Sequence, residues 1–220
     1  MTKKYINKAL AIVVIFSLLV STFPNISGTS YTDIQIDGDL SDWDNSDFLG
    51  QRNGAGFAFT WNEDNLYFYW NGTDFYSDIE GADFFLFFST TGGGSKLSKS
   101  WNSVEHNLPF SANYGLSIEN SNYYEFVEWN GSSWNVIESD GVEMYIGWSG
   151  NKASEIKLPL SYLGNPSNIS FMAWAQWQYE ANVWSSFPML NSASEAGAEY
   201  FTHYYSTELE EGISSSDIHI

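Results

Sequence analysis

Two stretches of the chain combine flat aromatic rings with polar side chains that can form hydrogen bonds. In the first, Trp101 is followed within five residues by His106, and the second runs from Trp174 to Trp184. Sugar rings have an apolar C–H face with hydroxyls around the edge, so exposed indoles beside amide or imidazole groups suit them. The pattern predicts a carbohydrate site made of Trp101, His106, Trp174, Gln176, Trp177, Gln178 and Trp184, in which Trp101, Trp177 and Trp184 provide stacking faces.

The alternative for each of these rings is burial. The chain has 10 Trp, 14 Tyr and 16 Phe, and most of them must form the core of a protein of this size. Trp43, Trp61 and Trp70 are predicted to be core residues, because the last two lie in phase with neighbouring aromatic positions.

No motif for catalysis is present. The chain has no Gly-x-Ser-x-Gly, no His-Glu-x-x-His and no Cys. Gly92 to Lys96 lacks the Gly-Lys-Ser/Thr order of a phosphate-binding loop, since Leu97 follows Lys96. The 27 Asp and Glu residues form many pairs by chance, and no pair stands out as glycosidase-like. We therefore expect no catalytic residues.

Clustered aspartates make a structural calcium ion one alternative. Asp37, Asp39 and Asp42 fall within six residues, and calcium prefers several oxygen ligands. The competing interpretation is that these aspartates cap backbone amides in a turn, while the indole of Trp43 folds back onto the core.

Length and charge limit the class of protein. Residues 1–28 have Lys3, Lys4 and Lys8 before an apolar run, and they are predicted to be a signal peptide for export. Without them, five basic and 27 acidic residues give a net charge of −22, which disfavours nucleic acid and anionic membranes as partners. We expect an extracellular protein, secreted or attached to the cell surface, with no membrane span once the signal is cleaved; an uncleaved N-terminal membrane anchor is the alternative.

Period-two alternation of apolar residues indicates an all-β protein. Residues 57–61 and 66–70 alternate around a polar turn, 83–89 is apolar on both faces, and 123–129 and 134–138 flank Asn130-Gly131. Residues 142–148 and 169–177 alternate again, and one helical turn is expected at 160–163. Such a pattern predicts an antiparallel β-sandwich with almost no helix. The expected domain spans 29–206, and 207–220 is expected to be a polar, disordered tail.

Several of these stretches, in this order, resemble the DOMON-like β-sandwich superfamily, which includes the family 9 carbohydrate-binding modules. They are residues 34–43, 57–70, 83–88, 155–164 and, more loosely, 198–205, so that the resemblance covers roughly 33–205. It implies an extracellular, non-catalytic module that binds an oligo- or polysaccharide, alone or with a secreted glycoside hydrolase.

The resemblance also implies two alternatives. One is a haem-binding electron-transfer domain, for which a Met or His would be the axial ligand. The candidates are Met144, Met172, Met189, His106, His203 and His219, although Met144 lies in phase with core positions. The other alternative is a surface structural or interaction protein without a small ligand.

Overall fold

The computed structural model describes residues 33–52, 55–71, 82–147, 153–179, 181, 183–188, 201–209 and 216–219. The predicted signal peptide lies outside these ranges. The strands of the larger sheets are β1 (Phe48–Arg52), β2 (Ala55–Trp61), β3 (Asn65–Asn71), β4 (Ala82–Ser89), β7 (Tyr114–Asn120), β8 (Tyr123–Trp129), β9 (Trp134–Val136), β10 (Glu143–Tyr145), β11 (Ala153–Pro159), β12 (Asn168–Trp177), β13 (Val183–Phe187), β14 (Tyr204–Glu208) and β15 (Ser216–His219). A small hairpin consists of β5 (Ser95–Leu97) and β6 (Asn107–Ala112), and two 3-10 turns are η1 (Asn45–Asp47) and η2 (Leu160–Leu163).

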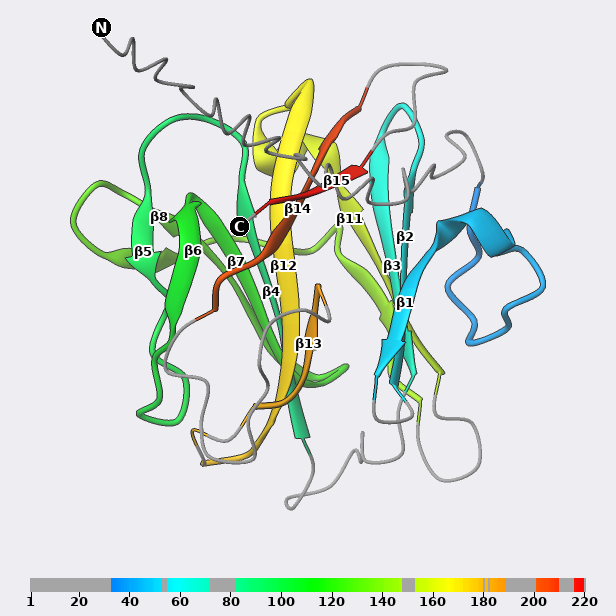
Figure 1. Ribbon diagram of the computed structural model, residues 1–220, viewed down its shortest axis with the longest axis horizontal. Coiled ribbons are helices and arrows are strands. Elements are labelled where there is room, and N and C mark those ends of the chain that lie inside the picture. Colours follow the sequence, from blue (N-terminus) through cyan, green and yellow to red (C-terminus); the bar gives the residue numbers. More distant parts are fainter. Residues whose placement is uncertain are drawn as a thin grey trace, which may run out of the picture.

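Two antiparallel sheets pack face to face, which confirms the predicted β-sandwich. One sheet has the order β1-β2-β3-β11-β10, and the other has the order β15-β14-β12-β4-β7-β8-β9, with β13 also paired to β12. Figure 1 shows the first sheet on the right and the second in the centre, with β5 and β6 on the side that faces away from β1, β2 and β3. None of the helices in the described ranges is long and apolar enough to cross a membrane.

Aromatic rings fill the space between the sheets. Phe84 of β4 stacks on Trp70 of β3 with ring centroids 3.9 Å apart and planes 3° apart. Phe171 of β12 contacts Phe59 of β2 at 4.5 Å. The alternation in the sequence supplies these contacts, because every second residue of each strand points into the same layer. Trp61 and Trp70 are buried there, as predicted.

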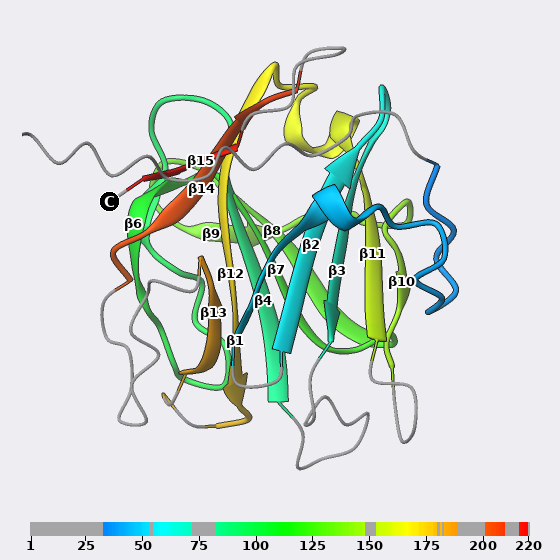
Figure 2. The same cartoon turned by 45° about the vertical axis from the view of Figure 1, so that its right-hand side comes forward.

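The predicted hairpins and turns are confirmed. Strands β2 and β3 pair from Gly56 opposite Asn71 to Trp61 opposite Leu66, and β8 and β9 pair around the Asn130–Ser133 turn. Gly164 ends η2 with a positive φ of 77°, a left-handed conformation that glycine adopts without steric cost. Figure 2 shows β13 beside β12, where β12 is long enough to pair with both β13 and β14.

Two stretches differ from the sequence-based prediction. No strand was predicted within residues 90–100, yet Ser95–Leu97 forms β5 and pairs with β6. Within the expected disordered tail, Thr207 and Glu208 belong to β14, and Ser216–His219 forms β15 alongside it. In both cases a partner strand supplies the backbone hydrogen bonds that stabilise the segment. Strand β6 pairs with β5, and β14 pairs with β15.

The chain covers the outer face of the five-stranded sheet with its own residues 33–47. Trp43 is buried, and its Nε1 donates to Glu155 Oε1 at 2.8 Å, while the backbone of Gly38 donates to Glu155 Oε2 at 2.6 Å. Burial is the largest cause that raises the pKa of Glu155, and these hydrogen bonds oppose it. The predicted folding back of Trp43 onto the core is therefore confirmed.

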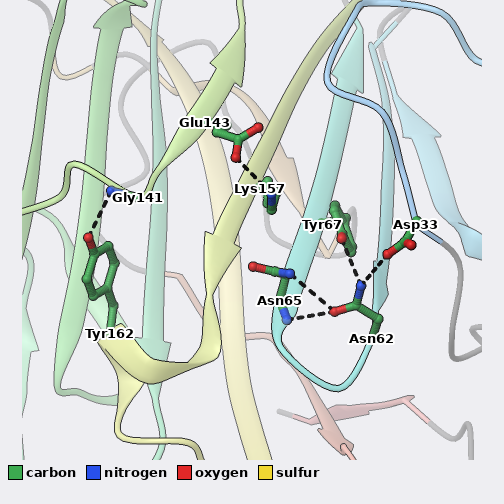
Figure 3. Close-up of polar contacts among 8 residues, drawn as sticks. All are labelled: Asp33, Asn62, Asn65, Tyr67, Gly141, Glu143, Lys157 and Tyr162. Atoms are coloured by element: carbon green, nitrogen blue, oxygen red, sulfur yellow. Dashed lines mark hydrogen bonds and ion pairs between the residues drawn. The ribbon is translucent and has the colours of Figure 1, made fainter.

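A polar group lies beside this covered area (Figure 3). Asn62 Nδ2 donates both to Asp33 Oδ1 at 2.8 Å and to Tyr67 Oη at 2.9 Å, and Asn62 Oδ1 accepts from the backbone of Asn65. Lys157 pairs with Glu143 at 2.8 Å across β11 and β10. The Asn62 contacts connect the turn between β2 and β3 to Asp33. The chain's own residues therefore cover this part of the five-stranded sheet.

Candidate functional site

The outer face of the eight-stranded sheet brings the predicted site residues together. Alternate residues of β4 and β12 point away from the main core and form a second apolar cluster with residues of β6 and of the segment before it. Its members are Phe85, Phe87, Trp101, Leu108, Phe110, Ala112, Met172, Trp174, Val183 and Phe201, with Trp134 and Tyr204 packed against them. The segment 95–112 therefore acts as a cover over the sheet.

Trp101 lies under this cover, so the prediction that it exposes a stacking face is wrong. The residue is 4% exposed, and its Nε1 donates to Asp83 Oδ2 at 2.8 Å. Asn102 Nδ2 donates to the same oxygen at 3.3 Å. Trp101 and Val104 pair through their backbones across a two-residue turn, in which Asn102 and Ser103 have positive φ values of 51° and 67°.

Asp83 is the most perturbed carboxylate on this face. It is fully buried, and its Oδ1 has no hydrogen-bond partner among the described residues. Its pKa is raised from 3.8 to about 7, mainly by burial and also by the nearby Glu119, while the Trp101 and Asn102 donors oppose the shift. A carboxylate with this pKa exchanges its proton near neutral pH, which is common at functional sites.

His106, Trp174 and Gln176 are also buried, and they form a hydrogen-bonded group. Gln176 Oε1 accepts from Trp174 Nε1 at 3.0 Å and lies 2.7 Å from His106 Nε2. An indole only donates, and Oε1 only accepts, so His106 Nε2 carries the hydrogen in this contact. The prediction placed these three residues together correctly, but they lie beneath the surface and cannot act as an exposed sugar platform.

The remaining predicted residues lie at the end of β12. Trp177 and Gln178 are half-buried, Gln178 Oε1 is buried without a partner among the described residues, and the neighbouring Tyr179 is 68% exposed. The backbone of Trp184 lies in β13, and its side chain is outside the described part of the structure. Trp177, Gln178 and Trp184 therefore stay as predicted binding residues.

Partly exposed aromatic rings are found on β8 and β9, where the sequence had not suggested a site. Tyr123 is 55% exposed and lies over Trp101, with ring centroids 5.5 Å apart. At the other end of β8, the half-buried Trp129 and Trp134 meet edge to face at 5.5 Å. Trp129 lies six positions after Tyr123, which is about 20 Å along a strand.

A charged pair lies between these two aromatic positions. Lys99 forms an ion pair with Glu125 of β8, and its ammonium lies 5.6 Å from the centroid of the Trp101 ring. Leu97 O accepts from Trp134 Nε1 at 3.0 Å, so the segment 97–99 lies along β8. We call Lys99, Tyr123, Glu125, Trp129 and Trp134 the β8 face.

The sequence carried a weak signal for the β8 face. Tyr123, Glu125 and Trp129 share one side of a strand that was predicted correctly, but alternation alone does not tell which side faces solvent. Their exposure depends on how far the 95–112 cover extends over β8, which is determined by tertiary packing and not by the local sequence.

The aspartates considered for calcium accept hydrogen bonds from backbone amides. Asp42 Oδ2 accepts from Gln35 N at 2.6 Å, Asp37 Oδ1 from Asp39 N at 2.9 Å, and Asp39 Oδ1 from Ser41 N at 3.0 Å. Within the described ranges, no group of three or more His, Asp or Glu side chains could hold a metal ion. These contacts agree with the turn-capping interpretation, and a structural calcium ion stays a prediction.

The described Met and His residues considered as haem ligands pack against apolar residues or contact neighbouring polar groups. Met172 is fully buried in the outer aromatic cluster, and Met144 packs against the main core, as predicted. His203 contacts Thr202 through Nδ1 at 2.8 Å. Met189 and the side chain of His219 lie outside the described part of the structure.

Comparison with known proteins yields only remote structural similarity. No protein-family model and no curated protein matches the chain. Two solved structures of a family 9 carbohydrate-binding module (CBM9) from Caldicellulosiruptor kristjanssonii, in complex with cellotriose and with glucose, are similar to it at 12% and 13% identity. Their TM-scores are 0.37 and 0.35, and the matches cover 68% and 66% of this chain and 75% of that chain in each case. The binding site therefore has to be derived from the residues of this chain.

Proposed function

We propose that the protein binds carbohydrate non-covalently at the β8 face and catalyses no reaction. The observation that carries this proposal is the arrangement of aromatic rings at both ends of β8, the exposed Tyr123 at one end and the half-buried Trp129 and Trp134 at the other, around an ion pair. Tyr123 and the Trp129–Trp134 pair offer apolar ring surface for the C–H faces of sugars.

The ion pair adds hydrogen-bonding capacity that fits sugar hydroxyls. Lys99 is a donor and Glu125 an acceptor, and they lie side by side. Neighbouring hydroxyls on a pyranose ring can accept from one group and donate to the other. The distance of about 20 Å between the aromatic positions favours an oligosaccharide over a single sugar.

Isothermal titration calorimetry with neutral oligosaccharides tests this proposal. The panel contains glucose, cellotriose and longer cello-, xylo-, manno- and malto-oligosaccharides. We expect affinity to rise with chain length, and Tyr123→Ala and Trp129→Ala each to weaken binding about three- to tenfold, equivalent to about 0.5–1.5 kcal/mol.

Tyr179→Ala is the matched control, since it removes another highly exposed tyrosine that lies outside the β8 face. This variant should bind like the parent protein. Loss of binding in Tyr179→Ala alone would move the site to Trp177, Gln178 and Trp184. Absence of binding across the whole panel would refute the carbohydrate proposal.

We also infer that the protein works outside the cell, as residues 1–28 suggest, alone or beside a secreted glycoside hydrolase. Mass spectrometry of the exported protein checks the first part. The expected mass lacks the signal peptide, and retention of an intact N-terminus in the membrane fraction would contradict cleavage.

A further inference from the structure

The turn that supports Tyr123 depends on one buried carboxylate. Residues 101–104 form a tight turn whose two central residues have left-handed backbones, a conformation that costs free energy for Ser103 in particular. Besides the backbone pairing of Trp101 with Val104, the turn is held by two side-chain hydrogen bonds, both to Asp83 Oδ2. Asp83 therefore anchors this turn to the sheet by hydrogen bonds, beside the packing of the Trp101 ring on Phe85 of β4.

The position of Trp101 in turn affects the β8 face. Tyr123 rests against the Trp101 ring at 5.5 Å, and Lys99 lies near the same ring while it pairs with Glu125. Three of the groups proposed to meet a ligand are thus in contact with Trp101 or linked to it. A shift of the indole would displace Tyr123 and Lys99 together.

We propose that Asp83 is a positioning residue for the β8 face, which holds the Trp101 turn in place when ionised and loosens it when protonated. A carboxylate accepts a hydrogen bond more strongly than a neutral carboxylic acid does. Protonation therefore weakens both attachments of the turn. This inference rests on the proposed function only where it concerns ligand affinity.

The surroundings of Asp83 make its protonation accessible. Burial and the negative charge of Glu119 raise the pKa of Asp83 to about 7. Glu119 follows Ile118 of β7, which pairs with Phe84 of β4. On β12, Gln176 lies opposite Asp83 and contacts His106. Lys99 and Glu125 also lie on this side of the sheet and are paired with each other, and Lys96 and Glu105 belong to the 95–112 cover.

The first test needs no ligand. Tryptophan fluorescence of the full chain is titrated from pH 5 to pH 9 for the parent protein, Asp83→Asn and Trp101→Phe. We expect a transition near pH 7 in the parent protein that is absent from both variants. A transition that persists in Asp83→Asn would belong to another group and would overturn the proposal, as would its absence from the parent protein.

Glu119→Gln provides a control for the direction of the effect. Removing this negative charge lowers the pKa of Asp83, so the transition should move to lower pH while its amplitude is kept. An unchanged midpoint would show that the titrating group does not sense Glu119, which contradicts its assignment to Asp83.

The second test measures the affinity for cellohexaose at pH 8.5 and pH 5.5. We expect about fivefold weaker binding at the lower pH, from the difference between a charged and a neutral hydrogen bond, and equal affinities at both pH values in Asp83→Asn. Equal affinities in the parent protein would overturn the coupling to ligand. No binding at either pH, together with the fluorescence transition, would refute the carbohydrate proposal and leave the positioning role supported.

Discussion

At the scale of single residues, two buried carboxylates differ in their hydrogen bonds: one has partners for both oxygens, and the other has partners for only one. Glu155 is fully buried, and both of its oxygens accept hydrogen bonds, from Trp43 and from the backbone of Asp37 and Gly38. Asp83 is equally buried, but one of its oxygens has no partner among the described residues. The first arrangement stabilises the fold, whereas the second resembles a site that can respond to its environment.

Trp43→Phe tests the stabilising role of the Glu155 contact. The substitution keeps an aromatic ring but removes the indole donor, which leaves Glu155 Oε1 buried without its partner. We expect the free energy of unfolding to fall by about 1–3 kcal/mol in urea denaturation, the usual cost of an unsatisfied buried polar group.

Trp134→Phe is the control for this loss. Its indole also donates a hydrogen bond, to Leu97 O, but at a site that water can reach. The free energy of unfolding should change by less than about 1 kcal/mol, because water replaces the missing donor. Equal losses in the two variants would show that the buried hydrogen bond contributes no more to stability than the solvent-accessible one.

At the scale of elements, the strands with strict alternation could be predicted, and the cover over the outer face could not. The paired strands β2 and β3, the buried β4 and the long β12 follow from the spacing of their aromatic residues. The β5–β6 hairpin was missed because β5 lies in a Gly- and Ser-rich stretch and β6 contains Pro109, which is typical of edge strands.

The same cover explains why the predicted site was only partly right. Trp101 and Trp174 have the residue type and the polar neighbours of a sugar platform, but segment 95–112 buries both. Tyr123 looks like an ordinary strand residue, yet it lies beyond the cover and is exposed. Which rings reach solvent depends on contacts between distant segments, and spacing along the chain does not encode these.

Gly115 of β7 shows how tightly the outer face is packed. A Cβ atom added there would lie 2.6 Å from a ring carbon of Phe87, and that ring contacts Trp174 at 5.3 Å and Trp134 at 5.5 Å. We expect Gly115→Ala to lower the free energy of unfolding by about 1–3 kcal/mol through overpacking, measured by urea denaturation.

Gly92→Ala is the matched control for Gly115→Ala. No atom lies within 4 Å of the position that its Cβ would take, so the expected change is below about 1 kcal/mol. A Gly115→Ala protein as stable as Gly92→Ala would mean that Phe87 can move freely, and that the outer cluster is loosely packed.

At the scale of the whole molecule, the acidic net charge and the burial of Asp83 both lower the stability of the fold as pH rises. The folded chain keeps a proton on Asp83 up to a pH of about 7, whereas the unfolded chain releases it near pH 3.8. Stability therefore falls as pH rises between these values, because the unfolded state binds fewer protons. Repulsion among the 27 acidic residues, opposed by few basic ones, adds to this fall as they ionise.

Salt separates the two contributions, because it screens exposed charges but has little effect on the cost of burying a carboxylate. We expect the melting temperature to be lower at pH 8 than at pH 5.5, and high sodium chloride to recover part of the difference. In Asp83→Asn, the difference in melting temperature that remains at high salt should be smaller than in the parent protein, because the asparagine side chain carries no charge to bury. A melting temperature that rises with pH, or an Asp83→Asn variant with the same pH dependence as the parent protein, would show that Asp83 is not the buried acid that limits stability.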